Sequence, residues 1–292
     1  MVGDARHATI EGVLDPSIVS HYELGLEESR LFVGDVPTLE FVRTLELLDR
    51  LLPAAPARVL DVGGGTGVYA VPLSERGYTV HLVDPITSHV ERAQQIAQNR
   101  SLTNMTASVG DARDLQQNDA DYDAVLLMGP LYHLTEERDR LLAFREAIRV
   151  CRPGAVVIGV GIPRYASLID GLKRRILDDP TFRAIVLRDL HDGQHRNPDV
   201  TTRPEFFTTA YLHLPDELER EARTAGLSDV ELFAIEGPSW ILEDPEDFDN
   251  QLFAARATES ERPLMAATSH MMVTGRTASA DTSARPDGPI GA

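Results

Sequence analysis

Apolar and polar residues alternate along the chain in blocks that predict alternating strands and helices. Short apolar runs, typical of strands buried on both faces of a sheet, are separated by stretches in which apolar residues recur with the helical period. The expected strands are residues 59–62, 78–83, 105–109, 122–128, 155–160, 230–235 and 269–276. The helices expected between them are residues 68–76, 88–99, 135–150, 215–225 and 244–255. This order predicts an α/β fold with a mostly parallel sheet and helices on both of its faces.

Two regions depart from this alternation. Before the first strand, residues 17–32 and 38–53 have the pattern of two amphipathic helices, which predicts an N-terminal helical cap. After the fifth strand, residues 164–214 contain two further helical patterns and a polar loop. They predict an inserted substrate lid, because loops at the carboxyl ends of strands carry function. The expected divisions are a cap at 1–54, a core at 55–161 and 215–276, a lid at 162–214 and a disordered tail at 277–292.

Composition and charge narrow the classes of partner. The formal net charge of −18 repels phosphate backbones, so no nucleic-acid partner is expected. No apolar run approaches the roughly 18 residues of a membrane span, and the N-terminus lacks the pattern of a signal peptide. The sequence therefore predicts a cytoplasmic protein without membrane association. The single Cys151 is expected to be a buried, inert thiol, and a homodimer is one candidate for the oligomeric state.

A glycine-rich loop follows the first expected strand. Residues 58–69 read RVLDVGGGTGVY, an apolar run that turns through glycines towards a helix N-terminus, where anionic groups bind well. The dinucleotide pattern G-x-G-x-x-G is not met, because Val68 occupies its last position. Asp61 lies two residues before Gly63, where a carboxylate repels a pyrophosphate and suits an ammonium group. Asp84, which ends the second strand, is placed to accept both hydroxyls of a ribose.

The pattern D-x-G-G-G-T-G of this loop resembles motif I of the class I S-adenosylmethionine (SAM)-dependent methyltransferases. Three later segments extend the resemblance: Gly-Asp-Ala at 110–112, Gly-Pro-Leu-Tyr-His-Leu at 129–134 and Arg-Pro-Gly-Ala at 152–155. The resemblance covers about residues 57–160 strongly and implies a Rossmann-like, seven-stranded sheet whose last strand returns antiparallel. It implies SAM as cofactor, S-adenosylhomocysteine (SAH) as product and no metal. The N-P-P-Y segment of nucleic-acid amino methyltransferases is absent, which argues against methylation of bases.

The resemblance also implies roles for individual residues around the cofactor. Asp111 would accept a hydrogen bond from the adenine amino group, while a Tyr and an Arg of the cap, here Tyr22 and Arg30, would reach the methionine carboxylate. The alternatives are a helix N-cap for Asp111 and surface positions for the other two. The expected cofactor-binding residues are Tyr22, Arg30, Asp61, Gly63, Gly65, Gly67, Asp84, Pro85, Asp111, Ala112 and Met128.

His133 is the first candidate for a general base. It follows the fourth strand, so the carboxyl-end rule for open sheets places it at the ligand crevice, and imidazole accepts a proton near neutral pH. The alternative is a structural histidine hydrogen-bonded to backbone under the adenine. Tyr22 and His213 are the other catalytic candidates. Aromatic walls would suit an aromatic or apolar substrate, unless these residues pack the cap instead. The expected substrate-binding residues are Tyr132, His133, Tyr165, Phe207, Tyr211 and Trp240.

Metal binding is not expected. His191 and His195 have a spacing that would suit a metal on a helix, but the Asp-Gly-Gln between them predicts a turn, and no third ligand is evident. The favoured function is methyl transfer from SAM to a carbon, nitrogen or oxygen nucleophile of a small molecule in secondary metabolism. A SAM-binding protein without catalytic activity and an NAD-dependent oxidoreductase are the alternatives.

Overall fold

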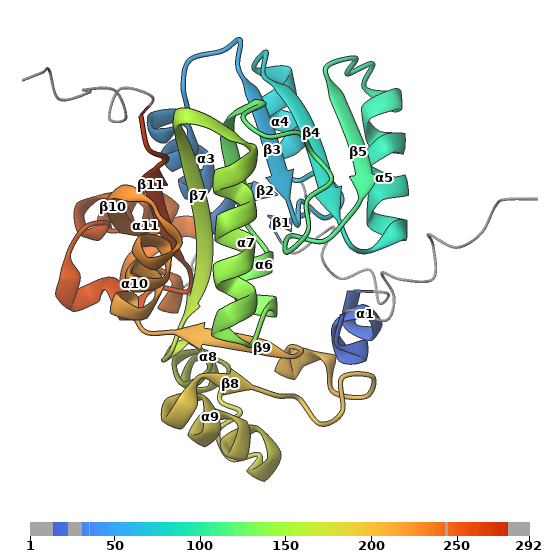
Figure 1. The fold of residues 1–292 in the computed structure, drawn as a ribbon. Coiled ribbons are helices and arrows are strands. Elements are labelled where there is room, and N and C mark those ends of the chain that lie inside the picture. The colour runs from blue at the N-terminus through green and yellow to red at the C-terminus, as the bar shows by residue number, and fades with distance from the viewer. Residues whose placement is uncertain (1–13, 23–30, 35, 243–244, 280–292) are drawn as a thin grey trace, which may run out of the picture.

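A twisted sheet with helices on both faces forms the centre of the protein (Figure 1). A computed structural model describes residues 14–22, 31–34, 36–242 and 245–279. Along the main path of the sheet the described strands follow the order β10-β11-β7-β6-β3-β4-β5, and β9 and β8 extend it beyond the end of β7. Their bounds are Arg58–Val62 for β3, Thr79–Asp84 for β4, Met105–Val109 for β5, Tyr122–Leu127 for β6, Cys151–Pro163 for β7, Ser228–Ala234 for β10 and Met271–Arg276 for β11.

The pairing directions confirm the predicted fold class. Strand β3 runs parallel to β4 and β6, and β6 runs parallel to β7. Strand β11 lies antiparallel between β7 and β10, as expected for a last strand that returns. Both faces of the sheet are buried: Leu60 packs into the core on one face and Val59 into the core on the other. This double burial explains why the strands read as continuous apolar runs.

Most helices lie close to their predicted positions, with shifts at their ends. Of the helix predicted at 17–32, the structure describes α1 at Pro16–Tyr22 and places Phe32 in strand β1, while residues 23–30 lie outside the described part of the chain. Helix α4 begins only at Ala70, so that Pro72 falls within its first turn, where a missing backbone N–H is tolerated. Strand β7 begins at Cys151, four residues before the predicted 155, and burial raises the pKa of the Cys151 thiol to about 12, which keeps it protonated. The helices around the sheet are Leu39–Leu51 (α3), Ala70–Glu75 (α4), Thr87–Asn99 (α5), Pro130–His133 (α6), Glu137–Val150 (α7), Pro215–Ala225 (α10) and Phe248–Thr258 (α11).

The segment between β7 and α10 is the predicted insertion, and it is anchored in the sheet. Its last strand pairs in parallel with the end of β7, through Ile162 and Leu212. A small apolar core of its own includes Phe182 and Phe206. Its elements are α8 (Ala166–Arg174), α9 (Pro180–Asp192), β8 (Gln194–His195), the 3-10 helix η1 (Pro204–Phe206) and β9 (Ala210–His213).

The N-terminal segment reaches the same insertion. Helix α1, Pro16–Tyr22, contacts it through Ser17, whose hydroxyl oxygen lies 2.7 Å from that of Thr209 (Figure 1). The short strands β1 (Phe32–Val33) and β2 (Val36–Pro37) form a hairpin ahead of α3. Among the described helices none has the length and apolar content to cross a membrane.

A buried ion pair joins α7 to α10. The Arg140 guanidinium donates from Nε and Nη2 to the two carboxylate oxygens of Glu221, at 2.9 and 2.7 Å, and both side chains are 2% exposed or less. Arg140 also stacks over the ring of Tyr211, with its Cζ 3.8 Å from the ring centroid. Glu221 lies 3.4 Å from Nε2 of His213. These contacts tie the last strand of the insertion to the core.

Removing one charge from this pair is expected to destabilise the fold. In Glu221→Gln the buried guanidinium of Arg140 would lose its counter-charge, and loss of one partner of a buried pair costs about 3 kcal/mol or more. Urea titration monitored by circular dichroism measures the free energy of unfolding. Glu219→Gln on the same helix is the control, because Glu219 pairs with the exposed Arg262 and such pairs contribute about 1 kcal/mol or less. Equal losses in the two variants would contradict the expectation.

Candidate functional site

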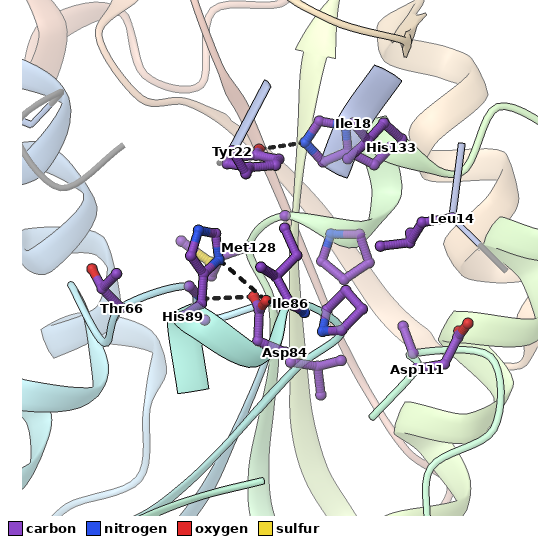
Figure 2. A pocket seen from close by; sticks show the side chains of 18 of the residues that line it. Leu14, Ile18, Tyr22, Thr66, Asp84, Ile86, His89, Asp111, Met128 and His133 are labelled. Carbon is purple, nitrogen blue, oxygen red and sulfur yellow. Dashed lines mark hydrogen bonds and ion pairs between the residues drawn. The ribbon is translucent and has the colours of Figure 1, made fainter. Parts of the chain in front are cut away.

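A cavity lies where β3, β4, β5 and β6 end (Figure 2). It encloses about 1030 Å³ of empty space, its open mouth included. Residues that directly follow each of the four strands line it, and α1 closes one side through Ile18 and Tyr22. Of the residues predicted to bind a cofactor or a substrate, those in the wall are Tyr22, Gly63, Gly65, Asp84, Pro85, Asp111, Ala112, Met128, Tyr132 and His133.

The glycine loop approaches the cavity closely because it carries no side chains. Gly63 and Gly65 have φ angles of +72° and +56°, which favour glycine. A Cβ on Gly63 would lie 2.6 Å from Cδ of Pro130, whereas a Cβ on Gly65 would meet no atom nearer than His89, at 4.0 Å. Open space therefore adjoins the main chain at Gly65. Gly67 is buried under the loop, not in the cavity wall, and its Cβ would press on Met105 at 3.0 Å.

Asp84 is held at the end of β4 with its carboxylate in the cavity wall (Figure 2). One oxygen accepts a hydrogen bond from the Gly65 N–H at 2.9 Å. The other accepts from the Ile86 N–H at 2.9 Å and lies 3.2 Å from Nδ1 of His89. Each carboxylate oxygen accepts two hydrogen bonds or more, so the side chain retains capacity for a ligand hydroxyl. His89 was not predicted, although its position one turn into α5 after Asp84 is a usable signal.

Asp111 also lies in the wall, with an arginine as its partner. The Arg113 side chain donates from Nε to one carboxylate oxygen at 2.9 Å and from Nη2 to the other at 2.5 Å. The backbone N–H of Arg113 also donates to Asp111, but the segment forms a turn and no helix begins there. The alternative of a helix N-cap is therefore not what the structure shows. Arg113 was missed, although an Arg two residues from an Asp is visible in the sequence.

Asp61 is fully buried and does not line the cavity, unlike the other predicted acids. It points into the layer that contains Leu82, and its carboxylate lies directly behind Gly64, whose Cβ would come within 2.6 Å of it. Among the described residues neither carboxylate oxygen has a hydrogen-bond partner. Burial, with a contribution from the nearby charge of Asp84, raises the pKa of Asp61 to about 7. Behind the loop, Asp61 therefore either carries a proton or is able to pair with a positive charge.

Tyr22 and His133, 111 residues apart, meet at the mouth of the cavity (Figure 2). The Tyr22 hydroxyl lies 2.5 Å from Nε2 of His133, and Nδ1 of His133 lies 3.2 Å from the backbone oxygen of Thr209. A carbonyl oxygen only accepts, so Nδ1 carries the hydrogen. In the neutral imidazole Nε2 is then the acceptor, and Tyr22 donates to it. The sequence also allowed a purely structural His133 that is hydrogen-bonded to backbone, and the contact with the Thr209 oxygen is such a bond. The ring nevertheless lies in the cavity wall, where a ligand can reach it.

Several predicted residues do not reach the cavity. His213 is 0% exposed and packs against Gly161 and Glu221, which is incompatible with the role of a general base expected from its position. Its strand β9 joins the sheet, so alternation turns the side chain inward. Tyr165 is exposed at the N-cap position of α8. Phe207 lies behind the wall, against His133, and Tyr211 lies beside Arg140. Arg30 and the side chain of Trp240 lie outside the part of the chain that the structure describes.

A second cluster of ionisable groups lies away from the cavity. Within the described residues, Glu40, Glu236 and His270 place oxygen and nitrogen atoms within 4.8 Å of one another, a spacing that would suit a metal ion. The Glu236 carboxylate already accepts hydrogen bonds from the Thr268 hydroxyl at 2.8 Å and from Nδ1 of His270 at 2.7 Å. These bonds tie the start of β11 to the segment after β10.

Comparisons with known proteins agree with this geometry. The family described as "Methyltransferase domain" matches residues 59–154. An uncharacterized methyltransferase of Mycobacterium tuberculosis is 38% identical over 172 residues, which are 58% of this chain and 60% of that protein. These matches support a class I SAM-dependent methyltransferase. The alignment spans about 60% of the curated relative's length.

Solved structures share the fold of this chain. The CcbJ methyltransferase of Streptomyces caelestis superposes with a TM-score of 0.59 at 17% identity, over 91% of this chain and all of that one. Phosphoethanolamine N-methyltransferase 2 of Haemonchus contortus, solved with SAM, superposes with a TM-score of 0.51 at 17% identity, over 81% of this chain and 52% of that one. At these identities the likeness concerns the fold alone.

The residues of the cavity fit SAM. Asp84 retains acceptor capacity for ribose hydroxyls, and the bare main chain at Gly65 gives a ligand close access. The carboxylate of Asp61, directly behind Gly64 and without a hydrogen-bond partner among the described residues, would be a counter-charge for the ammonium group of the methionine part. Asp111 and Ala112 line the cavity, and the resemblance would place the adenine beside them. The acids and glycines that the resemblance assigns to SAM recognition thus lie at neighbouring strand ends.

Proposed function

We propose that the protein transfers the methyl group of SAM to a carbon, nitrogen or oxygen nucleophile of a small aromatic or apolar molecule and releases SAH. The observation that carries this proposal is the hydrogen-bonded pair of Tyr22 and His133 in the wall of the cofactor cavity. When SAM is bound, its sulfonium supplies an already activated methyl group. The chain then has to hold the acceptor atom in line with the bond between the sulfur and the methyl carbon, and to exclude water.

The Tyr22–His133 pair is suited to remove the proton that the acceptor loses. Because Nε2 of His133 accepts from the Tyr22 hydroxyl, the hydroxyl oxygen is able to take a proton from the acceptor while its own proton passes to Nε2. Nδ1 keeps its hydrogen on the Thr209 carbonyl throughout, which holds the ring in place. The acceptor would lie beside Tyr22, Tyr132 and His133, across the cavity from the glycine loop.

The charges of the cavity wall favour a neutral or cationic acceptor. None of the described residues that line the cavity is a lysine or an arginine, and its exposed surface is mainly apolar. The overall charge of −18 acts in the same direction. The aromatic walls provided by Tyr22, Tyr69 and Tyr132 suit a flat or apolar molecule. Phosphorylated and nucleic-acid acceptors are disfavoured for the same electrostatic reason.

Calorimetry followed by a transfer assay tests the proposal. The purified protein is expected to bind SAM and SAH, and not NAD, because Val68 and Asp61 do not suit a pyrophosphate. SAM labelled in its methyl group is then offered with a panel of amines, phenols and enolisable or indole carbons, and label is expected in one of these classes. Binding of SAM without transfer to any member would instead support a non-catalytic SAM-binding protein. Binding of NAD alone would overturn the proposal.

A further inference from the structure

One turn of the insertion contacts the Tyr22–His133 pair from behind. The Thr209 carbonyl accepts the hydrogen bond from Nδ1 of His133, and the ring of Phe207 lies 5.9 Å from that of His133 between centroids. The same turn meets α1, because the hydroxyl oxygens of Thr209 and Ser17 are 2.7 Å apart. His133 and the helix that carries Tyr22 are thus both seated against residues 206–209, none of which lines the cofactor cavity.

The turn is held in a conformation that it would not adopt alone. Phe207 has φ +65° and ψ −164°, a region populated almost only by glycine, and this costs on the order of 1–3 kcal/mol. Such strain persists only where the surroundings fix the backbone. Asn197 does so: its amide nitrogen donates to the carbonyls of Arg203 and Phe207, at 2.8 and 2.7 Å. Its amide oxygen accepts from the Asp199 N–H at 3.0 Å.

A buried histidine fixes the adjacent carbonyl. His195 is 3% exposed and lies with Nε2 2.8 Å from the Phe206 oxygen and with Nδ1 2.8 Å from a carboxylate oxygen of Asp189. Carbonyl and carboxylate oxygens only accept, so two hydrogens are needed for these two contacts. Because Asp189 is 0% exposed, losing either contact would leave a buried polar group unpaired.

We propose that Asn197 and His195 are positioning residues that act through the strained turn 206–209: they set the Thr209 carbonyl so that His133 keeps its hydrogen on Nδ1 and offers Nε2 to Tyr22. This inference rests on the proposed function, because it assigns the insertion a role in the reaction and not only in covering the substrate. The role is separate from cofactor binding, since neither residue lines the cavity.

The test uses Asn197→Asp, which keeps the shape of the side chain and its acceptor for the Asp199 N–H while removing both donors to the turn. Histidine-selective ¹⁵N spectra of the whole protein report which ring nitrogen carries hydrogen, and His133→Gln assigns the signal. In the unsubstituted protein His133 is expected as the Nδ1–H form, and in Asn197→Asp as a mixture of forms. With an acceptor, kcat is expected to fall roughly tenfold to a hundredfold while the dissociation constant of SAM is unchanged.

The matched control is Thr201→Ala in the same loop, whose exposed hydroxyl donates to Asp199 and not to the turn. It is expected to leave the His133 signal and kcat as they are. His195→Gln is the second variant if Asn197→Asp unfolds the insertion, because one amide cannot serve both Asp189 and the Phe206 carbonyl. An unchanged His133 signal in both variants would overturn the inference. The spectra need no acceptor, so a failure of the methyl-transfer proposal would be recognised separately.

Discussion

Replacing His133 by Gln is expected to lower kcat by about a hundredfold to ten-thousandfold, with the dissociation constant of SAM changed little. Gln retains hydrogen-bonding groups near Tyr22 but has no basic nitrogen, so the variant isolates the loss of proton acceptance. Tyr22→Phe is expected to have a similar effect on kcat, because it removes the oxygen between acceptor and imidazole. Steady-state transfer of labelled methyl to the acceptor found in the panel measures both.

The double variant distinguishes a working pair from two separate contributions. If the proton passes from Tyr22 to His133, the second substitution should add little to the first, as for residues that act as a unit. Multiplicative losses would indicate independent roles. His191→Gln is the control, because His191 is exposed on α9 and contacts only Asp192 among the described residues. Unchanged turnover in His133→Gln at saturating acceptor would mean that positioning alone drives the reaction, as for an electron-rich carbon.

The cofactor half of the site could be predicted because its residues follow consecutive strands. Gly63, Asp84 and Asp111 each lie at or just beyond the carboxyl end of a parallel strand, and the topology brings such ends to one edge. The glycine spacing disfavours a dinucleotide loop without any tertiary information. Asp61 lies on the predicted strand, but the sequence does not show that its side chain is buried behind Gly64, outside the cavity wall.

The acceptor half depended on contacts between distant segments. Tyr22 contacts His133 because α1 docks on the insertion. No local sequence pattern predicts this docking. His213 is predicted as a candidate base from its position just before the next helix. In the structure β9 pairs with the end of β7 and joins the sheet, and its alternation buries His213. The strain at Phe207 is also invisible in the sequence, because any residue type can be forced into a turn by its neighbours.

Above neutral pH, Asp61→Asn is expected to raise the free energy of unfolding and to weaken the binding of the cofactor. The pKa of Asp61 is raised from 3.8 to about 7, so in the folded protein the acid holds its proton at pH values where the unfolded chain has lost it. The folded state is therefore favoured most below pH 4, and this contribution is lost as pH rises through 7. A shift of about three units corresponds to about 4 kcal/mol.

Without the ligand, Asp61→Asn should therefore abolish most of the fall in the free energy of unfolding between pH 4 and pH 8, measured by urea titration at several pH values. The same substitution removes the counter-charge behind the glycine loop, so SAM and SAH should bind about tenfold more weakly at pH 8. Methylthioadenosine, which lacks the amino-acid part, is the matched ligand and should bind both proteins equally. Equal weakening for all three ligands would show that the variant distorts the loop, and unchanged SAM affinity would show that Asp61 is a structural acid alone.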